Sequence, residues 1–146
     1  MATFSFLNTT ASISGPGGSF ALGSGSGNAE EGITINMAND KSSLTIGADG
    51  SGMYSLHADK SGEVTVTLLK TSPVNALLMS LYDYQQLSST TWGQNVITIN
   101  DTASGDTTSA RQVAFKKKPE IKQQKEAGTN QWVFMAVQID TVLGTF

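Results

Sequence analysis

The sequence predicts a mainly β domain, a β-sandwich or split β-barrel of antiparallel strands with one α-helix packed on its flank. Two observations support this prediction. Short segments alternate apolar and polar residues, as half-buried strands do, and clusters of Gly, Asp, Asn and Ser separate them as turns. A single segment, 72–87, has helical periodicity instead. With 146 residues and no cysteine, the chain is long enough to form one domain, 1–146, without disulfides.

The predicted helix over residues 72–87 divides the strands into two groups. Ser72 and Pro73 are typical N-cap and first-turn residues. Five residues at the i, i+3, i+4, i+7, i+8 spacing form its predicted apolar face: Val74, Leu77, Leu78, Leu81 and Tyr82.

The predicted strands follow the alternation of apolar and polar residues. They span residues 3–13, 33–37, 44–46, 53–58, 63–70, 95–101, 107–116 and 131–142. A glycine- and serine-rich segment, 14–31, is predicted to be a flexible loop. Short turns are expected to join neighbouring strands into hairpins, including 53–58 with 63–70. The last strand is apolar on both faces and is therefore expected to be central in the sheet or covered on both sides.

Charged residues are scarce and unevenly distributed. They make up 14% of the chain, against about 25% in a typical domain, and 17 Ser and 17 Thr take their place. Such a surface suits a subunit covered by copies of itself, because charges are costly to desolvate, although an ordinary Ser/Thr-rich β-protein fits as well. The segment 111–125 has six basic residues and one acidic residue, a local charge of +5, which leaves −8 for the remainder.

The basic segment 111–125 contains three consecutive lysines, Lys116, Lys117 and Lys118. A solvated strand end or loop is the ordinary interpretation of such a run. A nucleic-acid patch is disfavoured because the chain as a whole is acidic. The third interpretation is contact between this segment of one copy and the acidic surface of the next.

No catalytic, cofactor or metal site is predicted. The glycine-rich loop lacks the lysine of a phosphate-binding loop, and the lone His57 cannot form a multi-histidine metal site. Two carboxylate pairs are candidates for the acid and base of a small hydrolase, Glu30 with Glu31 and Asp101 with Asp106. Adjacent acids point to opposite sides of an extended chain and nothing places either pair in a pocket, so no enzyme is expected. No segment has the roughly 20 apolar residues of a membrane span.

Four stretches, taken together, resemble the tail tube (inner tube) protein family of contractile-tailed bacteriophages and prophages. They are SGPGGSFALGSGSGNAEEGITI, LTIGADGSGMYSLHADKSGEVTVTLLKTSPVNALL, QVAFKKKPEI and GTNQWVFMAVQIDTVLG. The resemblance covers almost the whole chain and lies in the order of the pieces, whereas residues 82–92 match no part of the pattern closely.

This resemblance implies a structural subunit of a hexameric ring. The rings would stack into a hollow tube inside a contractile sheath, and the genome would pass through the lumen without specific binding. Sheath, baseplate and tape-measure proteins are the implied partners. The implied location is the virion tail, after synthesis in the host cytoplasm. The family has no catalytic residues to transfer.

By analogy with the family, loops that become ordered between rings are assigned to residues 14–31 and 40–60. The individual candidates for contacts between subunits are Gly15, Pro16, Gly17, Gly18, Phe20, Lys116, Lys117 and Lys118. The lumen is expected to be acidic, because lysines lining it would hold the phosphate backbone of passing DNA.

Two further interpretations remain open. One is a carbohydrate-binding β-sandwich module of an adhesin or tail fibre, with Trp92, Tyr82 or Tyr84 as stacking platforms. The other is the tube protein of a type VI secretion or phage-like bacteriocin machine, which would share the same architecture.

Overall fold

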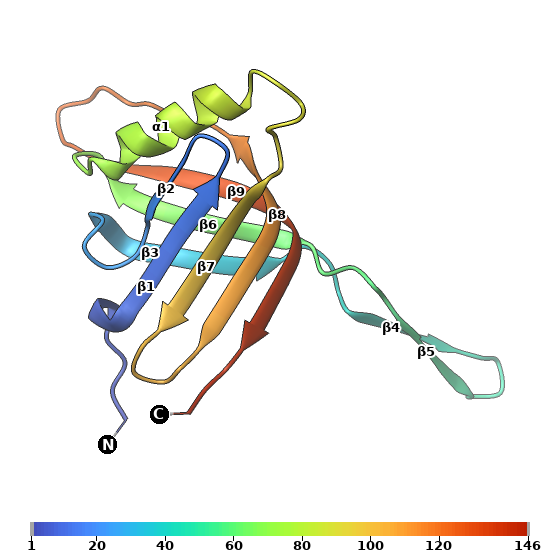
Figure 1. Cartoon of the computed structure of the whole chain (residues 1–146). Coiled ribbons are helices and arrows are strands. Elements are labelled where there is room, and N and C mark those ends of the chain that lie inside the picture. The colour runs from blue at the N-terminus through green and yellow to red at the C-terminus, as the bar shows by residue number, and fades with distance from the viewer. Residues whose placement is uncertain (1, 146) are drawn as a thin grey trace.

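The computed structural model describes residues 2–145, without the side chains of residues 29–31. It contains a mainly β body, one helix and a long two-stranded projection (Figure 1). The elements in chain order are η1 (Phe6–Asn8), β1 (Thr9–Gly15), β2 (Gly18–Ala21), β3 (Asn28–Met37), β4 (Ser42–Ile46), β5 (Gly52–Leu56), β6 (Gly62–Leu69), α1 (Val74–Gln85), β7 (Asn95–Asp101), β8 (Thr107–Lys117) and β9 (Thr129–Val142).

Seven strands form one antiparallel sheet in the order β2-β1-β7-β8-β9-β6-β3, and β4 pairs only with β5. The sheet does not close into a barrel, but it folds over: β1, β7 and β8 cross in front of β3 and β6 (Figure 1). Side chains from both groups of strands belong to one core, for example Ile13 and Ile97 with Val64 and Val66. The mainly β prediction with one flanking helix is therefore confirmed, as is the central position of the last strand.

A β-bulge at Gln112 contributes to the bending of β8. Gln112 has a φ of 53°, and the pairing of β7 with β8 shifts by one residue between Asn95↔Val113 and Ile97↔Ala110. An extra residue in one strand bends it and increases its twist.

The helix α1 is shorter than predicted and turns a slightly different face to the core. Ser72 accepts a hydrogen bond from the Val74 amide through its Oγ, at 3.3 Å, so the helix begins after Pro73. The buried residues are Val74, Leu78, Leu81 and Gln85. Leu77, expected on the apolar face, is 48% exposed, because the buried stripe runs through Leu78 and Leu81 to Gln85 instead.

An aromatic cluster joins the helix to the sheet. Phe115 lies at its centre and is 1% exposed, with its ring centroid 5.4 Å from that of Tyr82, 6.3 Å from Trp92, 5.9 Å from Trp132 and 4.9 Å from Phe134. Edge-to-face pairs of this kind add stability beyond the area they bury. Tyr82 is thus part of the packing between helix and sheet, as its helical spacing predicts.

The first third of the chain is more structured than predicted. Residues 6–8 form the 3-10 helix η1 where a strand from residue 3 was expected, because Ser5 accepts a hydrogen bond from the Leu7 amide and closes a turn. The expected loop 14–31 contains β2, which pairs with β1, and the beginning of β3. Leu22 within this segment is fully buried. The segment is therefore not one continuous loop.

The predicted pairing of 53–58 with 63–70 is wrong. β5 pairs with β4, whereas β6 pairs with β3 and β9. The chain turns at 47–51, so that β4 and β5 form a hairpin of their own, outside the main sheet. Leu44 and Ile46, expected to be half buried, are 53% and 59% exposed because nothing else in the described part of the chain covers that hairpin.

No helix between residues 2 and 145 is long and apolar enough to cross a membrane. Among the side chains that the structure describes, which exclude those of 29–31, no three from His, Asp or Glu are grouped as a metal ion would require.

Candidate assembly interface

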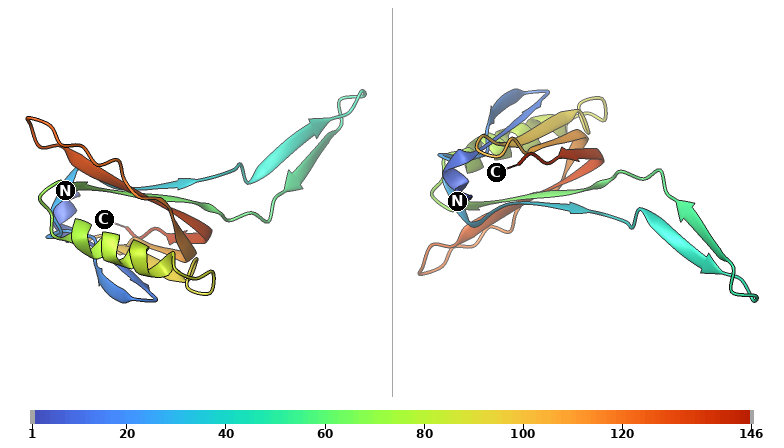
Figure 2. Two further views of the ribbon diagram at one scale, coloured as in Figure 1. Left: turned by 90° about the horizontal axis from the view of Figure 1, so that it is seen from above. Right: turned by 90° about the horizontal axis from the view of Figure 1, so that it is seen from below.

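A long hairpin, residues 38–61, projects from the body of the protein and is called the arm below. It contains β4 and β5 and extends well beyond the core in all three views (Figures 1 and 2). Its tip is the turn 47–51, in which the Gly47 amide donates to the Ser51 carbonyl at 2.7 Å. Asp49 accepts hydrogen bonds through Oδ1 from both the amide (3.0 Å) and the hydroxyl (2.6 Å) of Ser51, and these bonds lower the pKa of Asp49.

One face of the arm is apolar and exposed. Directly opposed residues of an antiparallel pair lie on the same face, and the register pairs Leu44 with Tyr54, Ser42 with Leu56 and Ile46 with Gly52. Leu44, Ile46, Tyr54 and Leu56 therefore share one face, called the apolar arm face, and are 53 to 80% exposed. A two-stranded hairpin alone is marginally stable in water, and contiguous exposed apolar surface marks an interaction site.

The base of the arm is held by hydrogen bonds to Asp59. Its Oδ2 accepts from the Asn39 side chain at 2.6 Å, and its Oδ1 accepts from the Ser61 amide at 2.8 Å. The Ala38 amide donates to the Ser61 carbonyl at 3.1 Å. Hydrogen bonds from Ser61 and then Asn39 lower the pKa of Asp59 from an ordinary value of 3.8 to about 2.

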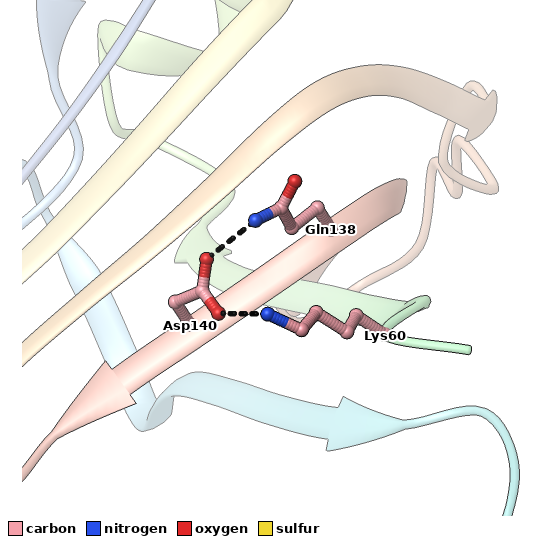
Figure 3. Close-up of polar contacts among 3 residues, drawn as sticks. All are labelled: Lys60, Gln138 and Asp140. Carbon is pink, nitrogen blue, oxygen red and sulfur yellow. Dashed lines mark hydrogen bonds and ion pairs between the residues drawn. The ribbon is translucent and has the colours of Figure 1, made fainter. Parts of the chain in front are cut away.

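A second set of contacts ties the base of the arm to β9 (Figure 3). The carboxylate of Asp140 accepts from the Gln138 side chain at 2.8 Å and pairs with the Lys60 ammonium at 3.3 Å, which lowers the pKa of Asp140. The Ile139 amide donates to the Lys60 carbonyl at 2.9 Å. The arm is therefore fixed at its base and unsupported along β4 and β5.

Acidification is expected to loosen the base of the arm. A carboxylate with a lowered pKa contributes stability above its ordinary pKa, and the contribution is lost as the pH falls through the lowered value. The Asp59 contacts should therefore persist down to pH 4 and be lost towards pH 2. Hydrogen exchange of the Ser61 amide as a function of pH, corrected for intrinsic rates, measures this. Asp59→Ala, which removes the acceptor, should show weak protection of that amide already at neutral pH, and unchanged protection in this variant would contradict the assignment.

The connection between β8 and β9 forms a basic pocket. Lys70, Lys117, Lys118 and Lys122 are among the residues that line a hollow of about 400 Å³ there. The Lys70 ammonium donates to the Lys122 carbonyl and to the Gln123 side chain, which holds the connection against the end of β6. This group of four lysines with the hollow between them is called the basic pocket below.

The three consecutive lysines have different surroundings. Lys116 pairs with Glu63 at 3.0 Å, so its charge is met within the chain. Lys117 and Lys118 line the basic pocket, are exposed, and take part in none of the ion pairs found among the described residues. The structure thus leaves Lys117 and Lys118 as contact candidates and gives Lys116 a partner of its own.

The other predicted contact residues lie in the β1–β2 hairpin, whose turn is packed against the helix. The side-chain amide of Gln85 donates to the Pro16 carbonyl at 3.0 Å. The side chains of Gln85 and Asn95 also exchange two hydrogen bonds, at 2.6 and 2.8 Å. Gly15 and Gly17 leave no room for a side chain, because an added Cβ would lie 1.9 Å from Asn95 Oδ1 and 2.7 Å from the Tyr84 ring.

Packing within the chain therefore accounts for the glycine at positions 15 and 17, without any contact to another subunit. Gly18 borders open space, so it stays a contact candidate. Phe20 is half buried and packs against the core, which leaves only part of its ring for another subunit.

Of the two candidate carboxylate pairs, Asp101 and Asp106 have structural roles, whereas the side chains of Glu30 and Glu31 lie outside the described part of the structure. Asp101 is buried and accepts from the Ala103 and Ser104 amides in the β7–β8 turn, and Asp106 accepts from the Gly144 amide at 2.7 Å. His57 is exposed on the arm. By analogy with the family, the sequence assigned 40–60 to contacts between rings, and the arm contains this whole segment, so that assignment stays a prediction. The four residues of the apolar arm face were not named individually, although two alternating strands around a Gly-rich turn were the signal for them.

Known proteins that resemble this chain identify its family. The model of the bacteriophage PhiTE tail tube protein family matches residues 1–144. No curated protein sequence matches the chain.

Among solved structures, the sheath/tube terminator of the PVC extracellular contractile injection system is 12% identical, with a TM-score of 0.66 over 97% of this chain and 98% of that one. The PVC sheath-tube complex is 11% identical, with a TM-score of 0.61 over 97% and 92%. The anti-feeding prophage cap, which terminates its tube, is 11% identical, with a TM-score of 0.58 over 99% and 93%.

At these identities the solved structures establish a shared fold, which extends over nearly the full length of each chain. The family model independently spans all but the last two residues. The chain therefore belongs to the bacteriophage PhiTE tail tube protein family and is a structural subunit of a phage tail tube, a component of the virion tail.

Proposed function

We propose that this chain forms hexameric rings that stack into a hollow tube inside a contractile sheath. The observation that supports the proposal most strongly is the apolar arm face, which no described residue of the same chain covers. An apolar surface on a projecting hairpin gains free energy when a second copy covers it. In a stack of rings, the arm of each copy can extend beyond its own body onto the adjacent copy.

Free strand edges supply the second element of ring formation. β2 and β3 are the two edge strands of the seven-stranded sheet, and each pairs on one side only. Edge strands with unpaired backbone groups are templates for pairing with another chain. If the rotation that relates one copy to the next closes on itself, such pairs join the copies into a ring. The sheets of neighbouring copies would then form one continuous barrel around the lumen.

The proposed partners follow from the resemblance and from the names of the solved structures. Those structures are a sheath-tube complex, a tube terminator and a baseplate of contractile systems. By analogy, sheath, baseplate and tape-measure proteins are the partners of this chain, which is made in the host cytoplasm. The phage genome passes through an acidic lumen without specific binding, because dense lysine contacts to phosphate would retain it.

Electron microscopy of the purified protein over a range of concentrations tests the proposal, with light scattering on the same samples. Rings with sixfold symmetry that stack into hollow tubes are the expected result. Rings of another symmetry would overturn the hexamer while preserving the tube. A protein that stays monomeric at millimolar concentration, both alone and with a baseplate seed, would overturn the assembly itself.

Within the tail tube family, a tube that serves a contractile injection machine is a second candidate. The solved structures favour it because they come from extracellular contractile injection systems and an anti-feeding prophage. Genes for a capsid and terminase beside this gene would favour the phage tail, and their absence would favour the injection machine. A carbohydrate-binding module is disfavoured, because Tyr82 and Trp92 belong to the aromatic cluster around Phe115.

A further inference from the structure

The arm and the basic pocket lie at opposite ends of the molecule. In Figures 1 and 2 the arm extends from one end of the body, and the connection between β8 and β9 lies at the other. The tip of the arm therefore cannot reach the basic pocket of its own chain. Any contact between these two surfaces must join different copies head to tail, and a head-to-tail contact repeats from copy to copy.

The two surfaces have opposite charge. The arm, residues 38–61, contains three Asp and two Lys, a charge of −1 with His57 neutral, whereas the lining of the basic pocket contains four lysines and one glutamate, Glu120, a charge of +3. Asp49 is the only charged residue of the tip 47–51. Complementary charge speeds encounter, fixes the register of an interface and suppresses wrong pairings.

The tip also has a shape that suits a narrow hollow. Its five residues, Gly-Ala-Asp-Gly-Ser, are all small. Both hydrogen bonds to the Asp49 side chain are accepted by Oδ1, so Oδ2 stays available to a lysine of another copy. The hydroxyl and amide of Ser51 hold the carboxylate in one orientation and lower its pKa.

We propose that the acidic tip of the arm, with Asp49 at its centre, docks into the basic pocket of a second copy of this chain. The inference rests on the proposed function, since it names the surface that receives the arm when copies assemble. Lys117 and Lys118, which have no acidic partner among the described residues, provide the charges that meet Asp49.

Disulfide crosslinking tests the contact directly, because the chain contains no cysteine of its own. One protein carries Ala48→Cys in the tip, and a second carries Gln124→Cys in the lining of the pocket, where it leaves all four lysines in place. The two are mixed, assembled and oxidised. The expected product is a reducible dimer that contains one chain of each kind. Ser80→Cys, exposed on the helix, replaces Gln124→Cys in the matched control and should yield little dimer.

Tubes that form normally but give no more tip-to-pocket dimer than the control would overturn the inference and leave the proposed function intact. An unmodified chain that forms no rings or tubes by electron microscopy would overturn the proposed function and the inference with it. The two failures are therefore distinguishable.

Charge reversal supplies an independent test of the same contact. Asp49→Lys alone, or Lys117→Glu with Lys118→Glu, should raise the protein concentration needed for assembly by about fivefold. All three changes in one chain should restore assembly towards that of the unmodified protein, because the charges are exchanged rather than lost. Triple variants that assemble worse than either parent would contradict the pairing.

Discussion

Leu44→Asp is expected to abolish tube formation while the monomer stays folded. Leu44 lies in the middle of the apolar arm face, opposite Tyr54, and is 53% exposed in the isolated chain. Burial of a leucine side chain at an interface contributes about 1.5–3 kcal/mol, and an unpaired carboxylate in the same place must be desolvated as well. Because every copy in the tube loses the same contact, the protein concentration needed for assembly should rise by at least about tenfold.

The matched control for Leu44→Asp is Thr45→Asp on the neighbouring position. Thr45 pairs with Met53 on the opposite face of the same hairpin, so its substitution introduces the same charge outside the apolar arm face. Light scattering and electron microscopy measure assembly, and circular dichroism measures the fold. Equal loss of assembly in both variants would attribute the effect to added charge on the arm and would refute a specific role for the apolar arm face.

The local features of the fold could be predicted because they are visible over a few residues. Alternation placed Val64, Val66 and Leu68 on the buried face of β6, and helical spacing placed Leu78 and Leu81 on the buried face of α1. Both patterns arise when one face of an element lies against the core of the same chain. The β7–β8 hairpin was predicted for the same reason, since its turn and both strands are contiguous.

The features that were missed depend on parts of the chain far apart in sequence. Nothing local to 63–70 indicates that this segment pairs with β3 and β9 instead of β5. The burial of Gln85 follows from its amide pairing with Asn95, ten residues away, which satisfies both side chains in the core.

The candidate interface was hidden by the same ambiguity. An amphipathic strand has one alternation pattern whether its own core or a second copy covers the apolar face. Leu44 and Ile46 therefore resembled half-buried core residues in the sequence. Only the three-dimensional arrangement separates an apolar face that is covered from one that awaits a partner.

Phe115→Ala is expected to destabilise the subunit by about 3–5 kcal/mol, the range typical of removing a buried aromatic side chain. Its ring is 1% exposed and contacts aromatic residues of the helix, of β9 and of the 86–94 segment, so the surrounding elements cannot collapse together into the cavity. At about 2–4 °C per kcal/mol for a chain of this size, the melting temperature should fall by roughly 6–20 °C.

Leu77→Ala is the control for Phe115→Ala, because Leu77 is a large apolar residue of the helix that packs on the sheet, yet it is 48% exposed. It should cost less than about 1 kcal/mol. Thermal unfolding of the unassembled chains measures both values, and equal losses would show that Phe115 does not hold helix and sheet together. Phe115→Ala and Leu44→Asp should therefore reduce tube formation for different reasons. Phe115→Ala should reduce assembly because fewer subunits are folded. Leu44→Asp should prevent assembly among folded subunits, because the surface that joins them is gone.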